Sequence, residues 1–171
     1  MNCIQLDKNK HDRKSFDCGI NALNHYLRVM ANQQSNKENA RTYILEDQSN
    51  PKQIIGFYTL TMQTLDLEKL PLHLQKKHKS ASTCGLIARL AVDKKYAKKG
   101  FGEWLLIDAL KKLLKASDLV GFPIITVDAK DGAAPFYEKF GFTPFLKHPD
   151  TLYMTITNIR HSLDIIPEQS T

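Results

Sequence analysis

One stretch, Ala88 to Leu114 (ARLAVDKKYAKKGFGEWLLIDALKKLL), constrains the fold of this chain more than any other. The overlapping run from Leu86 to Val92 is apolar and of strand length, and only Arg89 interrupts it. From Phe101 onward, leucines and alanines recur at helical spacing. Lys98-Lys99-Gly100-Phe101-Gly102 lies between them. The sequence therefore predicts a strand, a tight glycine turn and a helix in direct succession.

This junction predicts an anion-binding site. The first backbone N–H groups of a helix lack intrahelical partners, and the helix dipole favours negative charge there. The P-loop pattern is excluded because no Lys-Ser or Lys-Thr follows the glycines. The dinucleotide fingerprint is excluded because Leu105 stands where its third glycine belongs. A purely structural turn is the alternative.

Length and charge narrow the class of protein. A chain of 171 residues predicts a single domain over residues 1–171, with a loose tail after about residue 165. No apolar run is long enough to span a membrane, and the N-terminus lacks the apolar centre of a signal peptide. Three cysteines without metal spacing favour a reduced, cytoplasmic location. The net charge of +6 predicts a polyanionic partner, with a solvated lysine surface as the alternative.

The remaining patterns predict an α/β domain in which strands and helices are interspersed. Asp17 is expected to cap a helix that runs to Met30 and ends in the polar segment 32–39. The later elements are two hairpin strands (42–46 and 53–63), a short strand (124–127), a helix bearing Tyr137, and a strand (152–156) that continues over 158–163.

Three stretches in this order resemble a known family. They are FDCGINALNHYL (16–27), RLAVDKKYAKKGFGEWLL (89–106) and DAKDGAAPFYEKFGF (128–142). The last two resemble the acyl-CoA loop and the following helix of GNAT acetyltransferases. The first resembles the start of GNAT-type toxins from bacterial toxin–antitoxin modules. The resemblance implies a mixed, mostly antiparallel sheet with a splayed parallel strand pair, flanked by helices.

The resemblance also implies acetyl-CoA as co-substrate and assigns roles to residues. Backbone groups of Leu90, Ala91 and Val92 would pair with the pantetheine arm, and one N–H near Leu90 or Ala91 would polarise the thioester carbonyl. The diphosphate would lie on Lys98, Lys99, Gly100, Phe101, Gly102 and Glu103. Tyr137 would donate a proton to the departing CoA thiolate.

The sequence departs from the family pattern at the loop. Ala97 replaces a glutamine or arginine, and Lys98 replaces a frequent glycine, although Lys98 and Lys99 supply charge. Asp131 stands near a position where the family often has asparagine. Asp131 is expected either to contact the cofactor or to cap the Tyr137 helix.

Each candidate also has a structural interpretation. Tyr137 could be a core aromatic beside Phe136 and Phe140. Arg89 could lie at a sheet edge or pair with a carboxylate instead of contacting substrate phosphates. Cys84 is expected to be a buried thiol. The histidines lack metal-site spacing, so no metal is assigned.

The toxin resemblance implies a substrate and partners: the α-amino group of aminoacyl-tRNA, a ribbon-helix-helix antitoxin and a homodimer. Acetylation would block peptide-bond formation and translation. The basic charge agrees with tRNA, since phosphate neutralisation drives sequence-independent affinity. Charge clustering suggests contacts from Arg28, Lys37, Arg41, Lys76, Lys77, Lys79, Arg89, Lys94 and Lys95.

Two rival functions stay open at this point. One is a GNAT enzyme that acetylates a small amine or a protein amino group, which would not need a basic surface. The other is a non-catalytic CoA-binding or nucleic-acid-binding module. The Ala97 departure motivates the second rival, and the presence of Tyr137 opposes it.

Overall fold

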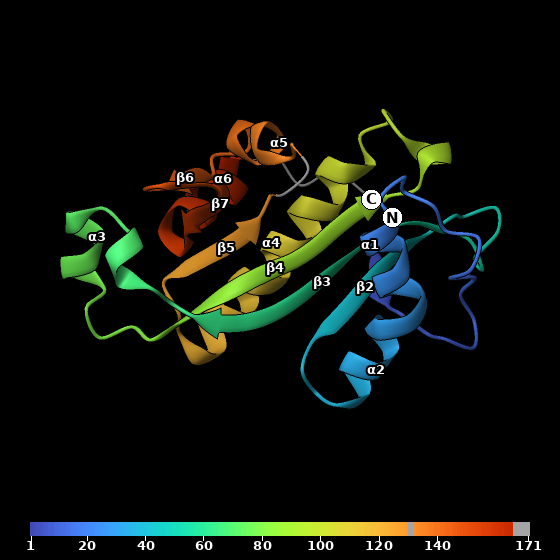
Figure 1. Cartoon of the computed structure of the whole chain (residues 1–171), viewed down its shortest axis with the longest axis horizontal. Helices are drawn as coiled ribbons and strands as arrows, with labels where there is room; N and C mark the ends of the chain where they lie inside the picture. Colours follow the sequence, from blue (N-terminus) through green and yellow to red (C-terminus); the bar gives the residue numbers. More distant parts are fainter. Residues whose placement is uncertain (130–131, 166–171) are drawn as a thin grey trace. The chain divides into compact units, whose positions relative to one another are not determined.

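The computed structural model describes residues 1–129 and 132–165. Seven strands form a sheet in the order β1-β2-β3-β4-β5-β7-β6, and β4 and β5 run in the same direction (Figure 1). The predicted α/β fold with a mixed, mostly antiparallel sheet and one parallel pair is confirmed. The splay of that pair stays a prediction. The chain divides into two compact units, Met1–Thr61 with Ile87–Ala109, and Met62–Leu86 with Leu110–Thr171.

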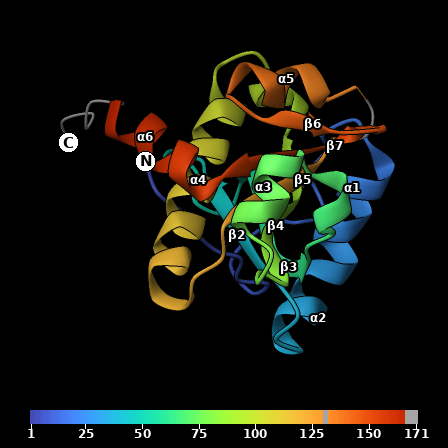
Figure 2. The same cartoon turned by 90° about the vertical axis from the view of Figure 1, so that its left-hand side faces the viewer.

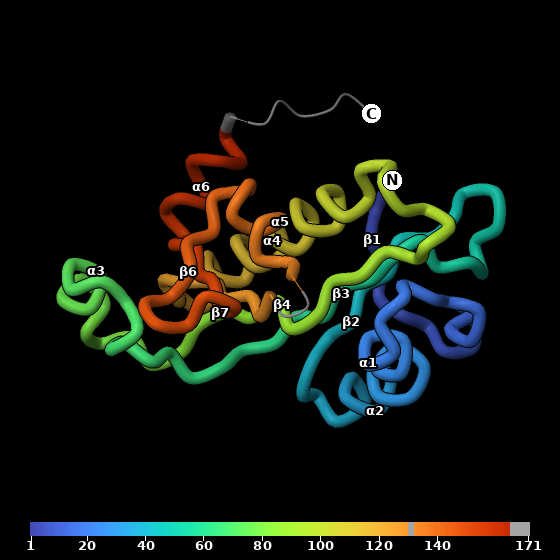
Figure 3. Tube along the Cα trace, turned by 45° about the horizontal axis from the view of Figure 1, so that its top comes forward, coloured from blue at the N-terminus to red at the C-terminus, as the bar shows by residue number. Residues whose placement is uncertain are grey.

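The first unit contains the N-terminal strands and helices. Its elements are β1 (Cys3–Gln5), α1 (Asn21–His25), the π-helical η1 (Tyr26–Met30), α2 (Ala31–Asn36), β2 (Arg41–Glu46), most of β3 (Ile54–Thr64), the end of β4 (Thr83–Val92), the 3₁₀ turn η3 (Lys94–Tyr96) and the start of α4 (Phe101–Val120). β1 pairs with β2, and β2 with β3, both antiparallel, so the predicted hairpin is confirmed. Figure 3 shows α1 and α2 lying together beside β2.

A buried cluster joins the α1–η1 helix to the strands of this unit. It contains Phe16, Tyr26, Leu27, Ala31, Ile44, Ile54, Phe57 and Ala91. The rings of Phe16 and Phe57 meet edge to face at 5.4 Å between centroids. Apolar burial of this kind is the main stabilising contribution, so the N-terminal segment is a structural part of the unit.

The second unit contains the C-terminal half. Its further elements are η2 (Leu67–Lys69), α3 (Leu72–Lys77), β5 (Ile124–Asp128), α5 (Ala134–Lys139), β6 (Thr143–Phe145), β7 (His148–Thr155) and α6 (Ile156–Ile165). β7 pairs antiparallel with both β5 and β6. α5 packs on β6 and β7, as Figure 2 shows. α5 ends where Gly141 takes the left-handed conformation (φ +93°), as predicted for a terminal glycine.

Two local predictions are wrong. Asp17 does not cap the first helix: the cap position is Ile20, because Gly19 (φ +86°) turns the chain before the helix begins. The helix itself ends in the polar segment 32–39, as predicted. It passes through the π-helical turn and continues to Asn36. Its end follows from Glu38, which has a left-handed φ of +64°.

The second wrong prediction is the strand over 158–163, which is helix α6. The Thr155 hydroxyl accepts the Asn158 N–H at 3.1 Å, which is the geometry of a helix N-cap. Ile156 and Ile159 follow at helical spacing, and Ile159 is fully buried. A threonine before this spacing was therefore the overlooked signal.

Candidate active site

The end of β4 is the first part of the candidate site. Leu90 and Val92 are half-buried, and Ala91 between them is buried. β3 approaches this segment closely at Gly56, where a Cβ atom would lie 2.7 Å from the Ala91 carbonyl oxygen. Only glycine fits such a close approach. Gly56 is therefore a residue of the site that sequence analysis missed, although a glycine inside a strand pattern is a signal for it.

The glycine loop follows Asp93 and η3. Gly100 has a φ of +83°, and Lys98 has a φ of +61°, a left-handed conformation that is rare outside glycine. α4 begins directly after the loop, and the Gly100 carbonyl accepts the Trp104 N–H at 3.1 Å. In the described part of the chain, no backbone N–H from Lys98 to Glu103 donates a hydrogen bond. These consecutive free donors at a helix N-terminus can hold a diphosphate.

Aromatic residues at both ends of the glycine loop, Tyr96 and Phe101, hold it in place. The Tyr96 hydroxyl donates to the Asp47 carboxylate in the turn between β2 and β3. This bond helps lower the pKa of Asp47 to about 2, after the larger effect of the Ser49 hydroxyl. The Phe101 ring meets the Tyr96 ring edge to face at 6.0 Å, and the Lys99 ammonium lies 5.9 Å from the Tyr96 ring centroid. The loop is thus held at both ends while its N–H groups stay free.

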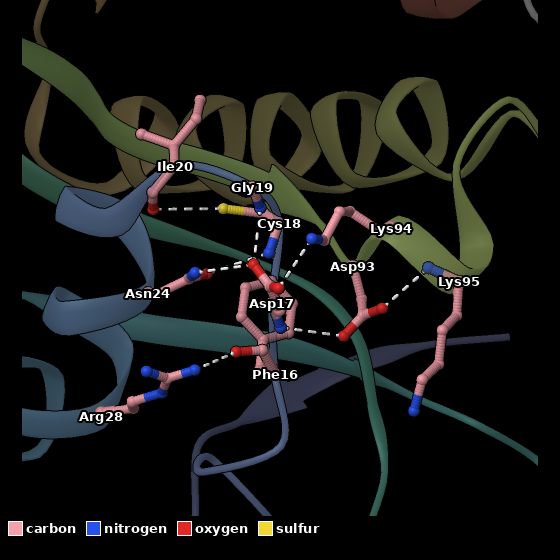
Figure 4. A network of polar contacts seen from close by, with 10 residues as sticks. All are labelled: Phe16, Asp17, Cys18, Gly19, Ile20, Asn24, Arg28, Asp93, Lys94 and Lys95. Atoms are coloured by element: carbon pink, nitrogen blue, oxygen red, sulfur yellow. Dashed lines mark hydrogen bonds and ion pairs between the residues drawn. The ribbon is translucent and has the colours of Figure 1, made fainter.

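Asp93 and Asp17 join the N-terminal segment to the end of β4 (Figure 4). The buried Asp93 carboxylate accepts the Asp17 N–H at 3.0 Å and the Lys95 N–H at 2.8 Å. The Asp17 carbonyl accepts the Lys94 N–H at 2.9 Å, so the two segments exchange hydrogen bonds. We call this set of contacts between residues 17 and 93–95 the N-terminal clasp.

The Asp17 carboxylate completes the clasp. It accepts the Gly19 N–H at 2.8 Å and the Asn24 amide at 2.9 Å, and it pairs with the Lys94 ammonium at 2.8 Å. The Lys94 contact is the largest of the interactions that lower the pKa of Asp17 well below its usual range. Asn24 is buried, and its amide oxygen accepts the Cys18 N–H at 2.9 Å. These contacts explain why Asp17 is not available as a helix cap.

Tyr137, the predicted proton donor, lies on α5 in the second unit. It is buried, and its ring meets those of Phe136 and Phe142 edge to face, so the packing interpretation describes its ring correctly. Burial, with a smaller effect of Asp128, raises the pKa of Tyr137 to about 12. The hydroxyl has no hydrogen-bond partner among the described residues. A protonated phenol whose O–H has no partner among these residues is suited to act as an acid.

Other predicted residues have structural surroundings. Cys84 is buried beside Thr126, which confirms the buried thiol that was expected, and burial raises the pKa of that thiol. Ala133 occupies the N-cap position of α5 and makes no side-chain capping bond. Asp131 itself lies outside the described residues. Within residues 1–129 and 132–165, no cluster of histidine, cysteine and carboxylate side chains could hold a metal ion. None of the described helices is long and apolar enough to cross a bilayer.

The basic candidates divide by their partners. In the first unit, Arg28 donates to the Phe16 carbonyl at 2.8 Å, Arg41 pairs with Glu38, and Lys94 pairs with Asp17. Lys95 is exposed beside them. Arg89 stacks on the Tyr26 ring, a contact that sequence analysis missed.

The basic candidates of the second unit lie on and just after α3. Lys76 and Lys77 are in its last turn, and Lys79 follows it. All three are exposed. Lys77 also lines an open pocket of about 410 Å³ with Phe122 and Pro123.

Comparison with known proteins gives consistent matches. The family model described as an acetyltransferase (GNAT) domain matches residues 38–144. A tRNA-acetylating toxin of Mycobacterium tuberculosis is 30% identical over 132 residues, covering 77% of this chain and 78% of that protein. A probable toxin TacT of Sinorhizobium fredii is 26% identical over 165 residues, covering 91% of each chain.

Solved structures agree with these matches. A tyrosine-to-phenylalanine mutant of KacT has a TM-score of 0.86 and 25% identity, over 94% of this chain and 97% of KacT. AtaT complexed with acetyl-methionyl-tRNAfMet has a TM-score of 0.83 and 27% identity, over 95% of this chain and 98% of AtaT. AtaTR has been solved with acetyl-CoA at a TM-score of 0.80 and 26% identity, over 95% of this chain and 97% of the matched one.

Proposed function

Because this chain belongs to the GNAT acetyltransferase family, we propose that it acetylates the α-amino group of aminoacyl-tRNA and acts as a toxin that blocks translation. Similarity to tRNA-acetylating toxins over most of the chain carries the proposal. The similarity to AtaT, solved with acetyl-methionyl-tRNAfMet, extends over 95% of this chain, and a tRNA-acetylating toxin is 30% identical over 77% of it. The net charge of +6 supports an RNA substrate.

The donor is acetyl-CoA, and the glycine loop supports this role. The free N–H groups from Lys98 to Glu103 would hold its diphosphate, with the Lys98 and Lys99 ammonium groups adding charge. These donors are main-chain groups, so the replacement of the family's glutamine or arginine by Ala97 removes a side-chain contact only. The backbone of Leu90, Ala91 and Val92 would pair with the pantetheine arm.

The chemistry needs little acid–base machinery. The neutral amine attacks the thioester carbonyl carbon and then releases a proton to water. A backbone N–H near Leu90 or Ala91 would stabilise the oxyanion. When the intermediate collapses, the carbon–sulfur bond breaks, and Tyr137 would give its phenolic proton to the CoA thiolate. Its pKa of about 12 keeps that proton in place at neutral pH.

The test uses labelled acetyl-CoA in a cell-free translation extract. The chain should stop translation and transfer label to aminoacyl-tRNA. Tyr137→Phe keeps the ring and removes the proton, so kcat should fall about 100-fold or more while the KM for acetyl-CoA changes little. Label on a small amine or on protein, with aminoacyl-tRNA unlabelled, would support the rival acceptor. No turnover with any amine would support the non-catalytic module.

Partners and organisation belong to the same proposal. AtaT has been solved with the C-terminus of its antitoxin AtaR, which supports an antitoxin for this chain. We propose a ribbon-helix-helix antitoxin, a homodimer and a cytoplasmic location.

The family match over residues 38–144 includes parts of both compact units and so supports one catalytic domain over residues 1–171. Co-purification with the product of the neighbouring reading frame would test the antitoxin.

A further inference from the structure

Arg89 is the one charged side chain in the apolar run 86–92 of β4. Side chains alternate along a strand, so Arg89 lies on the same face as the buried Ile87 and Ala91. Ala91 belongs to the cluster that contains Tyr26 and Leu27. Arg89 therefore points toward the α1–η1 helix, where its guanidinium carbon lies 3.7 Å from the centroid of the Tyr26 ring.

The guanidinium of Arg89 has no oxygen partner in the described part of the chain. The other four arginines each donate to an oxygen: Arg13 to the Arg28 carbonyl, Arg28 to the Phe16 carbonyl, Arg41 to the Ser35 carbonyl and to Glu38, and Arg160 to Asp118. Arg89 is half-buried, so its N–H groups are also only partly hydrated. The predicted pairing of Arg89 with a carboxylate is thus absent from these residues. The guanidinium is therefore open to an anionic ligand.

Stacking on the Tyr26 ring orients the Arg89 guanidinium for contact with such an anion. Tyr26 is only 3% exposed, so its ring is held by the core and fixes the plane of the guanidinium. Stacking uses the face of the guanidinium and leaves the N–H groups at its edge free for a two-point contact with a phosphate. Tyr26 also begins the π-helical turn η1, and such turns are frequent at functional sites.

We propose that Arg89, held by Tyr26, binds the phosphodiester nearest the 3′ end of the acceptor RNA and so selects amino groups that are esterified to an oligonucleotide. This inference rests on the proposed function. Arg89 precedes Leu90, the proposed thioester residue, by one strand position of about 3.3 Å. In an aminoacyl-tRNA the first anion behind the aminoacyl ribose is the phosphodiester that joins the last two nucleotides. An anion site beside the thioester therefore suits this substrate better than a free amino acid.

The test compares two acceptors that carry the same aminoacyl group. Aminoacyl-adenosine has no phosphate, and aminoacyl-cytidylyl-adenosine has one phosphodiester. The wild type should show a kcat/KM about 10-fold or more higher for the dinucleotide, because charge-assisted hydrogen bonds are among the strongest polar contacts. Arg89→Lys keeps the charge but loses the planar two-point contact, so this preference should fall to about 1-fold to 3-fold. The KM for acetyl-CoA should stay unchanged.

Three variants serve as controls. Arg160→Lys replaces an arginine that already pairs with Asp118, so it should keep the wild-type preference. Tyr26→Phe keeps the aromatic ring and should also keep the wild-type preference for the dinucleotide. Tyr26→Leu removes the ring and should reduce the preference toward that of Arg89→Lys, with acetyl-CoA binding as the check that the protein is folded.

The outcomes separate this inference from the proposed function. If the wild type acetylates neither the nucleotide esters nor aminoacyl-tRNA, the proposed function fails and the role of Arg89 fails with it. If the wild type is active but Arg89→Lys slows both acceptors equally, or neither, the proposed function stands and the phosphate contact is wrong. A selective loss with the dinucleotide establishes the contact.

Discussion

The Tyr137 hydroxyl combines burial with a proton that is hard to remove. Burial disfavours the charged phenolate and raises the pKa of Tyr137 to about 12. The same aromatic packing that makes Tyr137 look structural therefore keeps it protonated. A buried tyrosine of this kind can donate a proton at neutral pH but cannot serve as a base.

The pH dependence of acetyl transfer follows from this value. A proton donor loses its contribution as pH rises through its pKa, so Tyr137 should stay effective up to about pH 10. The acceptor must be neutral, and an α-amino group titrates near pH 8, roughly. We expect kcat/KM to rise with pH to a plateau, with no fall below about pH 10. A fall that begins below pH 9, present in the wild type and absent in Tyr137→Phe, would mean that Tyr137 loses its proton there and would contradict its raised pKa.

Lys98 holds a left-handed conformation in the glycine loop where the family often has glycine. That conformation costs a non-glycine residue about 1 kcal/mol. We expect Lys98→Gly to keep or slightly raise the free energy of unfolding, and to weaken acetyl-CoA binding by less than about 5-fold because the donors are backbone N–H groups. Lys99→Gly removes the same charge without relieving strain, so it should be less stable. Denaturant unfolding and calorimetry compare the two, and the reverse order of stability would rule out strain at Lys98.

Gly56 determines how closely β3 and β4 approach in the first unit. A Cβ there would lie 2.7 Å from both the Ala91 carbonyl oxygen and Leu105 Cδ1. Because backbone cannot move aside, Gly56→Ala should lower the free energy of unfolding by about 1–3 kcal/mol and weaken acetyl-CoA binding through Ala91. Gly85→Ala is the matched control, since the nearest atoms to its Cβ would all be side-chain atoms, of Phe122, Leu113 and Ile125. Equal losses for the two variants, measured by thermal unfolding, would refute this account.

We expect the N-terminal clasp to depend on the buried carboxylate of Asp93 more than on the exposed one of Asp17. Asp93→Asn would place an amide donor against the Asp17 or Lys95 N–H. Leaving a buried polar group unpaired costs about 1–3 kcal/mol, so this variant should be clearly destabilised. Asp17→Asn should lose less, because water can replace its contacts. Chemical denaturation of both variants tests the order, and a larger loss in Asp17→Asn would overturn it.

Elements formed by near neighbours were predictable, and contacts between distant residues were not. The apolar spacing after Phe101 correctly predicted helix α4, and Leu105, Leu106 and Ala109 of that spacing are buried. The bond between Asp17 and Asp93 joins residues 76 positions apart, so nothing next to Asp17 in the sequence showed that its backbone was already engaged. The clasp, Gly56 and the Tyr26–Arg89 stack are all contacts of this kind. The free N–H groups of the loop, by contrast, follow from the local glycine pattern.

At the scale of the whole molecule, the net charge of +6 supports association with RNA, but net charge alone does not locate the contact. Phosphate contacts make binding depend on salt, and each lost contact lowers the slope of log affinity against log salt by about 1. Lys76 and Lys77 form an exposed pair at the end of α3. Lys111 and Lys115 form an exposed pair on α4 that is not among the candidate contacts.

Reversing each pair separates local contact from overall charge. Lys76→Glu with Lys77→Glu and Lys111→Glu with Lys115→Glu both lower the net charge by four from +6. If α3 contacts tRNA, only the first variant should reduce the salt slope by about 2 and weaken tRNA binding about 10-fold or more at physiological salt. Both variants should bind acetyl-CoA like the wild type, since neither pair belongs to the glycine loop. If the two variants weaken tRNA binding equally, binding depends on the total charge of the protein. The proposed contact between α3 and tRNA would then be wrong.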